Sequence, residues 1–403
     1  MNDNHFTILC GVVMMIVLLV PVVSAVDPLW TQTPATSGEL SCIVISVDGS
    51  TIVAGGDRLV ALSRDGRKLW TGWSGTNLAI SRDGNYLVTS RDQTIRMITG
   101  TGTMLWDVSL EVPVTEISML PDASLIAAGG GSRIRIINAS GAGFRQNASI
   151  IFNHFRLFPD GNELVVTTSE SIQTSNLTLF TEWADTNVTQ DFVEVAGNGS
   201  SFVTVTNNRV RMYTRDGSLQ WDRALPGGNA LAFAYSGDGS TIVVGRDDNT
   251  IEVLDSNGTR LWTGHASSWV TSVAVSDDGN TIAAGSMDKS LSVYDRAGTR
   301  LGSSTLENPI KSHSVAVSSD GSVIAAVDAS AVYGFSRSQF TGPVTPATTT
   351  STPVVTTPVS AATSVPVLSP PVPSPVTTPQ AAISPAGPLA VLGLLLVFRV
   401  RKS

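Results

Sequence analysis

The sequence predicts an all-β chain that folds as an eight-bladed β-propeller, and three observations support this prediction. A pattern of apolar strand, Asp-Gly turn and apolar strand recurs along the middle of the 403-residue chain. The turns are spaced by 35, 39, 38, 38, 40, 40 and 42 residues, and a repeat of about 40 residues built of short strands is typical of a propeller blade. Several repeats also end in Leu-Trp.

The Asp-Gly turns define the first hairpin of each repeat, because this pair adopts the positive φ angles that join two antiparallel strands. The turn residues are Asp48, Asp83, Asp122, Asp160, Asn198, Asp238, Asp278 and Asp320. A second turn leads into a third strand and carries Asp57, Asp92, Asp248, Asp288 or Asp328. A seven-bladed ring stays an alternative, in which one irregular repeat between residues 113 and 190 is an excursion from the ring.

The Leu-Trp pairs are expected to end the fourth strand and to pack one blade against the next. These tryptophans are Trp70, Trp106, Trp262 and, in the variant Leu-Gln-Trp, Trp221; Phe144 and Phe180 are expected to replace them in two irregular repeats. The last repeat ends near Phe335 without an outer strand. Residues 28–35, which contain Trp30, are therefore predicted to supply that strand and to close the ring, which removes free sheet edges.

These units resemble a blend of WD40 repeats and quinoprotein (PQQ-type) propeller repeats. The strand-turn-strand core is similar to WD40, and the Leu-Trp ending is similar to the tryptophan-docking motif of quinoproteins. WD40 features are sparse, because Gly-His occurs once, at Gly264-His265, and Tyr294-Asp295 stands where Trp-Asp is usual. The resemblance spans residues 28 to 340 and implies a fold rather than a function.

Both ends of the chain differ in composition from the propeller, which we place at residues 27–340. Residues 6–23 are apolar and precede Ser24-Ala25, which predicts a signal peptide over residues 1–25. An uncleaved anchor stays open, since no Lys or Arg precedes the apolar run. Residues 341–388 hold 12 of the 20 prolines and no charged residue, which predicts a disordered, extended Pro/Thr-rich stalk.

The last segment, residues 389–403, combines a short apolar run over 389–398 with a basic tail. The run is shorter than the roughly 20 residues of a comfortable transmembrane helix, and the basic tail fits the positive-inside rule. Together with the preceding Ser-Pro-Ala-Gly-Pro, this end resembles the tripartite sorting signals of archaeal surface proteins, which are replaced by a lipid. A retained short anchor is the alternative, and either reading predicts an exported protein held at the cell surface by its C-terminus.

Composition excludes several functions. A net charge of −8 argues against nucleic-acid binding, which needs a basic face. Cys10 and Cys42 are the sole cysteines, so neither a disulfide framework nor a Cys-rich metal site is expected. The Asp-Gly pairs lack the spacing of a calcium loop and are interpreted as turns. The adjacent cysteines common in quinoprotein dehydrogenases, nucleophile elbows and P-loops are also missing, and we expect no cofactor, metal or enzymatic activity.

Candidate ligand-binding residues lie in the loops between blades, where one face of a propeller presents its side chains. Trp73 and Trp269 occupy such loops, with His265 and Arg246 as polar neighbours. Local packing of the two tryptophans against a neighbouring blade is the alternative. His154 and His313 fall on innermost strands, where a structural role is favoured although these strands line the central channel.

Six N-x-S/T sequons predict surface glycosylation if the protein is exported. They are Asn138, Asn147, Asn176, Asn187, Asn198 and Asn257. The leading functional hypothesis is a monomeric, non-enzymatic interaction module whose loop face binds an envelope protein, a cell-surface partner or a glycan. The alternatives are an enzyme that uses the central channel, such as a quinoprotein-like one, and a structural component of the envelope.

Overall fold

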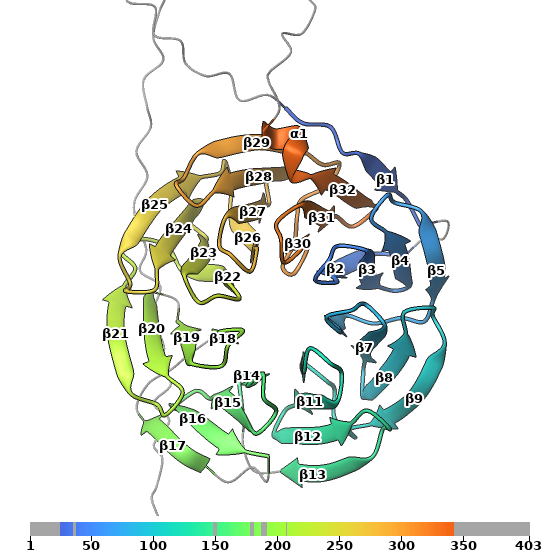
Figure 1. The fold of residues 1–403 in the computed structure, drawn as a ribbon, viewed down its shortest axis with the longest axis vertical. Helices are drawn as coiled ribbons and strands as arrows, with labels where there is room; N and C mark the ends of the chain where they lie inside the picture. Colours follow the sequence, from blue (N-terminus) through green and yellow to red (C-terminus); the bar gives the residue numbers. More distant parts are fainter. Residues whose placement is uncertain are drawn as a thin grey trace, which may run out of the picture. The chain divides into compact units, whose positions relative to one another are not determined.

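Eight four-stranded antiparallel sheets are arranged as blades around a central axis (Figure 1). The structure is a computed structural model that describes residues 25–34, 38–147, 151–177, 181–186, 192–206 and 208–341, without the side chains of 143–147 and 182. The prediction of an eight-bladed all-β propeller is confirmed, and the seven-bladed alternative is wrong. Residues 1–24 of the predicted signal peptide, residues 342–388 of the stalk and the C-terminal segment lie outside the described residues.

Seven blades follow chain order, with four consecutive strands each. Blade 1 contains β2 (Leu40–Ile45), β3 (Thr51–Gly56), β4 (Leu59–Ser63) and β5 (Lys68–Gly72); blade 2 contains β6 (Asn77–Ile80), β7 (Tyr86–Arg91), β8 (Thr94–Thr99) and β9 (Met104–Ser109). Blade 3 contains β10 (Glu116–Met119), β11 (Leu125–Gly130), β12 (Arg133–Asn138) and β13 (Gly143–Asn147); blade 4 contains β14 (His154–Leu157), β15 (Glu163–Thr167), β16 (Ser171–Asn176) and β17 (Thr181–Thr186). Blade 5 contains β18 (Phe192–Val195), β19 (Ser201–Val205), β20 (Arg209–Thr214) and β21 (Leu219–Ala224). Blade 6 contains β22 (Ala230–Tyr235), β23 (Thr241–Arg246), β24 (Thr250–Asp255) and β25 (Arg260–His265); blade 7 contains β26 (Val270–Val275), β27 (Thr281–Ser286), β28 (Ser290–Asp295) and β29 (Arg300–Thr305).

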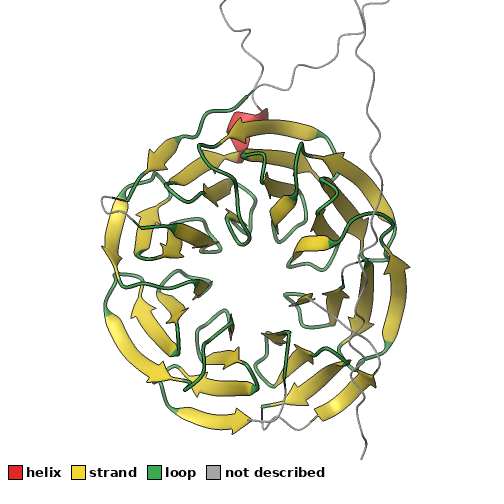
Figure 2. Ribbon diagram, turned by 180° about the vertical axis from the view of Figure 1, so that it is seen from behind, coloured by secondary structure: helices red, strands yellow, loops and turns green. Residues whose placement is uncertain are grey.

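Blade 8 joins the two ends of the described chain (Figure 2). Its inner strands are β30 (Val315–Val317), β31 (Val323–Val327) and β32 (Val332–Ser336), and its outer strand is β1 (Trp30–Gln32). Strand β1 pairs antiparallel with β32, with Trp30 opposite Gly334. The predicted closure of the ring by the N-terminal segment is therefore confirmed. The short helix α1 (Arg337–Thr341) follows β32, and no helix of the described ranges is long and apolar enough to cross a membrane.

The Asp-Gly turns adopt one repeated hydrogen-bonded form. In blade 1, the Ser46 hydroxyl donates to Asp48 Oδ1 at 2.7 Å, and Ser46 Oγ accepts the backbone N–H of Thr51 at 3.0 Å. Gly49 completes the turn with a φ of 69°, a conformation that a residue with a Cβ rarely adopts. The same pattern recurs in blades 2, 6, 7 and 8.

The tryptophans of the outer strands dock each blade onto the next, as the sequence predicts. Each indole packs on a positive-φ glycine in the last hairpin turn of the following blade: Trp30 on Gly66, Trp70 on Gly102, Trp106 on Gly141, Trp183 on Gly217, Trp221 on Gly258 and Trp262 on Gly298. Most of these indoles also donate Nε1–H to a backbone carbonyl of the same turn, as Trp262 does to Arg296 at 3.0 Å.

One docking position differs from the expectation, and another is filled without a tryptophan. In blade 4 the docking residue is Trp183 and not Phe180, which lies outside the described residues; Trp183 was missed because it does not follow a leucine. In blade 7 the position is Gly302, because a side chain there would collide with Phe340 of α1. Phe340 is buried beside Phe335 at a ring-centroid distance of 5.7 Å and so fills the place of an indole.

A circle of backbone hydrogen bonds links the Asp-Gly turns of neighbouring blades. Within the described chain these bonds join six of the eight interfaces: Val47 to Arg82, Arg82 to Pro121, Gly197 to Gly237, Asp238 to Asp277, Asp277 to Ser319 and Ser319 to Val47, each written from donor N–H to acceptor C=O. Pro121 and Pro159 occupy the donor position in blades 3 and 4, and proline has no N–H. The interfaces of blade 4 with blades 3 and 5 therefore lack this bond.

Candidate functional site

The antiparallel strands place two kinds of connection on opposite faces of the ring. The Asp-Gly turns, such as 48–49, form one face, which we call the turn face. The connections between blades, such as 73–76, 266–269 and 306–314, form the other, which we call the loop face. The loop face carries the ligand-binding residues predicted from the sequence.

Trp269 is the most exposed aromatic side chain on the loop face. Its relative exposure is 54%, and the neighbouring Met287 is 37% exposed. The backbone N–H of Met287 donates to the Trp269 carbonyl at 3.0 Å, which fixes the two residues side by side. His265, at the start of the same loop, is also exposed. Trp269 and Met287 are thus two exposed apolar residues on neighbouring positions of the backbone, and we call them the Trp269 patch.

Trp73 lies in blade 1, so it belongs to a different part of the ring. Its side chain is 39% exposed, and its Nε1–H donates to the Gly102 carbonyl of blade 2 at 3.3 Å. The Arg96 guanidinium lies over the indole, 5.2 Å from its centroid. Trp73 thus packs against the neighbouring blade, which matches the alternative reading of this residue.

Arg246 is buried rather than displayed on a surface. Its Nη1 donates to Glu252 Oε2 at 3.1 Å, and its other donors bond the carbonyls of Pro226 and Gly228. Both side chains of the Arg246–Glu252 pair are 3% exposed. Of the four predicted residues, the structure brings only His265 and Trp269 to the same loop.

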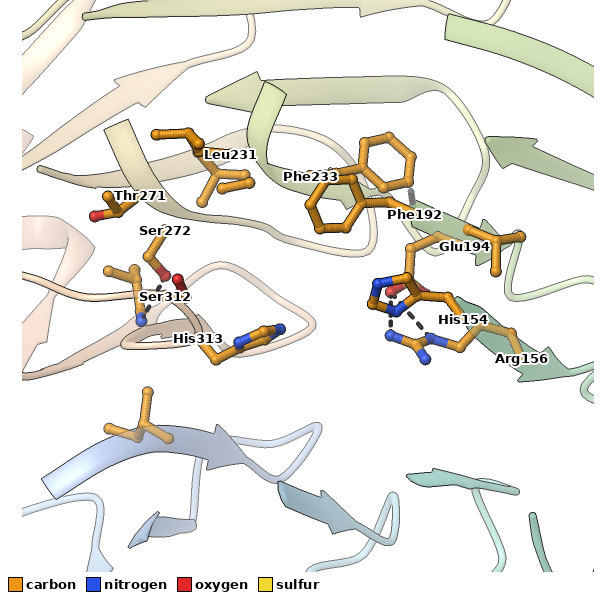
Figure 3. Close-up of a pocket in the computed structure, with 15 residues that line it drawn as sticks. His154, Arg156, Phe192, Glu194, Leu231, Phe233, Thr271, Ser272, Ser312 and His313 are labelled. Carbon is orange, nitrogen blue, oxygen red and sulfur yellow. Dashed lines mark hydrogen bonds and ion pairs between the residues drawn. The ribbon is translucent and has the colours of Figure 1, made fainter. Parts of the chain in front are cut away.

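The central channel contains two adjoining hollows, with cavity volumes of about 160 and 180 Å³. Innermost strands and the loops before them line both hollows, and His154, Arg156 and His313 line each of them. Figure 3 shows the hollow of about 160 Å³. His154 begins β14 and His313 precedes β30, so both lie near the loop-face ends of their blades, and Arg156 lies two residues further along β14. We call this region the channel mouth. Its wall also includes Phe192, Phe233 and Glu194, among others.

An ion-pair network crosses three blades at the channel mouth. Arg156 of β14 donates through Nη1 to Glu116 of β10, and through Nε and Nη2 to Glu194 of β18 at 3.1 and 2.9 Å. Burial alone would raise the pKa of Glu116, but Arg156 and His154 outweigh it and hold that pKa at about 2. The network therefore contains two carboxylates and one guanidinium at neutral pH.

His154 has a defined tautomer because its Nδ1 lies 2.9 Å from Glu116 Oε2. An ionised carboxylate only accepts hydrogen bonds, so Nδ1 carries the proton. In neutral His154 the remaining Nε2 is consequently an acceptor, and it takes no hydrogen bond from the described residues. The imidazole stacks on Phe192 with ring centroids 5.3 Å apart.

His313 faces this network from the opposite side of the channel (Figure 3). Its backbone has a φ of 57°, in the left-handed region, and its carbonyl accepts the N–H of Ile43 at 2.9 Å. The surrounding channel walls bury the ring, and this loss of solvation lowers the pKa of His313. Left-handed backbone at a non-glycine residue persists where the surroundings impose it, so the loop holds this imidazole in place.

No group of three or more His, Cys, Asp or Glu side chains within the described ranges is arranged to hold a metal ion. Cys42 lines one hollow as a buried free thiol, and burial raises its pKa to about 11. The second-turn aspartates have structural partners: Asp248 Oδ2, for example, accepts the N–H of Gly228 at 2.7 Å.

Comparisons with known proteins agree with this geometry. The profile of the family described as WD domain, G-beta repeat matches residues 258–295. The profile described as outer membrane protein assembly factor BamB, of PQQ type, matches residues 21–154. The chain is a β-propeller whose repeats are similar to WD40 and PQQ-type repeats. No curated protein matches its sequence.

Several solved structures share the fold of this propeller at low sequence identity. The C-terminal WD40 domain of Sif2 is 14% identical, with a TM-score of 0.68 over 78% of this chain and 99% of that one. Sqt1 from Chaetomium thermophilum is 15% identical, with a TM-score of 0.64 over 77% of this chain and 99% of that one. The same protein bound to the N-terminus of ribosomal protein L10 has the same identity and TM-score, over 77% and 100%. Such likeness establishes the fold alone.

The sequons of the propeller that can be placed lie mostly at the turn face. Asn198 and Asn257 are exposed in hairpin turns of that face, and Asn138 and Asn176 end strands that run toward it. Asn147 ends β13 instead, and Asn187 lies outside the described residues. The sequons therefore fall largely opposite the Trp269 patch and the channel mouth.

Sequence reasoning missed Glu116, Arg156 and Glu194. The signal that could have found them is a departure from the pattern of the innermost strands. These strands read Val-Ala-Val or a similar apolar run in most blades, but Glu-Ile-Ser-Met, His-Phe-Arg-Leu and Phe-Val-Glu-Val in blades 3 to 5.

Proposed function

We propose that this propeller is an exported, surface-anchored and non-enzymatic module that binds a protein of the cell envelope through its loop face. The observation that carries the proposal is the Trp269 patch, because exposed Trp and Met side chains beside one another are typical of the energetic centres of protein interfaces. The patch lies on the same face as the channel mouth, so one partner can contact both.

Two further observations support a protein partner. One similar solved propeller, Sqt1, is bound to the N-terminus of ribosomal protein L10. The family that matches residues 21–154 is described as an assembly factor. Export and anchoring rest on the apolar segment 6–23 and on the apolar and basic segment 389–403. The low fraction of charged residues, 14%, suits a surface covered by glycans.

The test is capture of envelope proteins by the full chain, followed by reconstitution with the captured protein after its purification. The variant Trp269→Ala should weaken this binding by more than tenfold, because a hot-spot residue contributes about 2 kcal/mol or more. Leu69→Ala is the matched control, since Leu69 is exposed on the outer strand β5, away from the loop face. Equal binding by both variants would remove the loop-face proposal. Recovery of the native protein from the cytoplasm instead of the envelope would remove the surface proposal.

A further inference from the structure

The channel mouth has charged groups that are not all used within the protein. Arg156 has Nε and Nη2 bonded to Glu194, and Nη1 bonded to Glu116 and to the Phe155 carbonyl. By contrast, Glu194 uses only Oε1 for this pair. Its Oε2 takes no hydrogen bond from the described residues. The side chain is 33% exposed, so a ligand in the channel can reach this oxygen. The hydrogen-bonding capacity that the described residues leave unused at this site therefore belongs to acceptor atoms.

His154 adds a second acceptor to the same wall. Its Nδ1–H is held by Glu116 at 2.9 Å, so the lone pair of Nε2 remains for a ligand. Glu194, His154 and Phe192 all line the same 160 Å³ hollow. A ligand that donates hydrogen bonds fits this wall better than one that accepts them.

The net charge of the channel mouth also favours a ligand that donates hydrogen bonds. Glu116 and Glu194 contribute two negative charges and Arg156 one positive charge. Apart from the histidines, no other carboxylate or basic side chain among the described residues lines the two hollows. With neutral imidazoles the net charge is negative. Charges in a partly enclosed cavity interact more strongly than in water, which favours a cation.

The remaining wall suits the aliphatic or planar body of such a ligand. Phe192 and Phe233 line the hollow beside Glu194 (Figure 3), and aromatic faces attract cations. The volume of about 160 Å³ holds on the order of ten water-sized groups, each of which needs about 10–15 Å³. This is room for one side chain and not for a folded element.

We propose that the channel mouth binds a single cationic side chain, lysine or arginine, which the partner inserts from the loop face. The cation would bond Glu194 Oε2 and His154 Nε2, and its stem would lie against Phe192 and Phe233. This proposal rests on the proposed function, because it names the group that the protein partner presents.

The experiment measures small probes rather than the partner, so that the two proposals can fail separately. The full chain in detergent is titrated by calorimetry with N-acetyl-arginine amide and N-acetyl-lysine amide. The matched probes are N-acetyl-glutamine amide, which is neutral, and N-acetyl-glutamate amide, which is acidic. We expect saturable binding of one or both cationic probes, with the arginine and lysine arms deciding which cation the site prefers.

Glu194→Gln should weaken binding of the preferred cation about tenfold, the effect of losing one charge-assisted hydrogen bond. Glu163→Gln is the matched control, because Glu163 also holds an arginine, Arg215, but near the turn face. If Glu194→Gln fails to fold, His154→Phe removes the second acceptor while it keeps an aromatic ring against Phe192, and it should also weaken binding.

Preference for the acidic or neutral probe, or unchanged binding in a folded Glu194 or His154 variant, would overturn the proposal. A partner that binds through Trp269 without any affinity for the cationic probes would leave the proposed function intact and remove the cation site alone. Cation binding without any captured envelope partner would leave the cation site intact and remove the proposed function.

Discussion

Arg156 Nη2 lies 2.9 Å from Glu194 Oε1, and the same guanidinium bonds Glu116, so one side chain of blade 4 joins blades 3 and 5. These two interfaces are the ones at which Pro121 and Pro159 remove the backbone bond of the turn face. The ion-pair network therefore joins, inside the channel, the same blades whose turns lack this backbone bond.

Removal of Arg156 should strongly destabilise the propeller. Arg156→Met leaves two carboxylates without their cation, and we expect a loss of about 2–4 kcal/mol in the free energy of unfolding, near the low end for broken buried pairs because the side chain is partly exposed. Urea denaturation measures this. The control Arg215→Met breaks the ion pairs of Arg215 with Glu163 and Asp160, which involve no residue that lines the two hollows. An equal loss in both variants would contradict a special role for Arg156.

Acid should weaken the same network in a defined pH range. The folded-state pKa of Glu116 is about 2, below its ordinary value of 4.5. Its contribution to stability is thus fully present above pH 4.5 and is lost as the pH falls toward 2. Denaturation midpoints measured across this range should fall less steeply for Glu116→Gln than for the unmodified protein. Parallel curves would show that Glu116 has no such linkage.

Docking and exposed tryptophans should respond differently to truncation. Trp262→Ala removes the ring that packs on Gly298 and the hydrogen bond to Arg296, and it should cost about 3–5 kcal/mol. Trp269→Ala should change stability by no more than about 0.5 kcal/mol, since its side chain is 54% exposed. Thermal or urea unfolding distinguishes them, and a large loss for Trp269→Ala would assign that residue a structural role.

The thiol of Cys42 should be inert in the folded protein. It is 6% exposed, and its pKa of about 11 keeps it protonated at pH 8, whereas thiol reagents attack the thiolate. Mass spectrometry after treatment with iodoacetamide should show no label on the peptide of Cys42 in buffer and full labelling in denaturant. Rapid labelling of the native protein would mean that the channel opens to expose this strand.

Amide hydrogen exchange should reveal the irregular sector around blade 4. Turn-to-turn backbone bonds join the turn of blade 4, near Pro159, to neither neighbour, and the turns of blades 3 and 5 to one neighbour each. We expect the amides of these turns, including the Gly199 turn of blade 5, to exchange faster than the matching turns of blades 6, 7 and 8, because locally weaker segments open more often. Uniform protection around the ring would contradict this.

The sequence predicts the fold well because each blade repeats local information. The Asp-Gly turns and docking tryptophans act through neighbours in the chain or in the next blade, so their spacing is enough to count eight blades. The candidate site is different. Glu116, Arg156 and Glu194 follow one another at intervals of about 40 positions and meet only when blades 3, 4 and 5 pack side by side. Burial of Arg246 similarly depends on Glu252 across the sheet and on loop carbonyls, which the local sequence does not reveal.

The two joints of the ring that differ from the rest lie at blade 8 and around blade 4, half a circle apart in an eight-membered ring. At blade 8, the outer strand is only three residues long. At blade 4, side chains replace backbone bonds. Two stiff arcs that are joined at two points on one diameter can move as units only by folding about that diameter. Force applied at Thr341, where the described part of the chain ends beside blade 8, would therefore bend the ring out of its plane about the line that ends near Arg156.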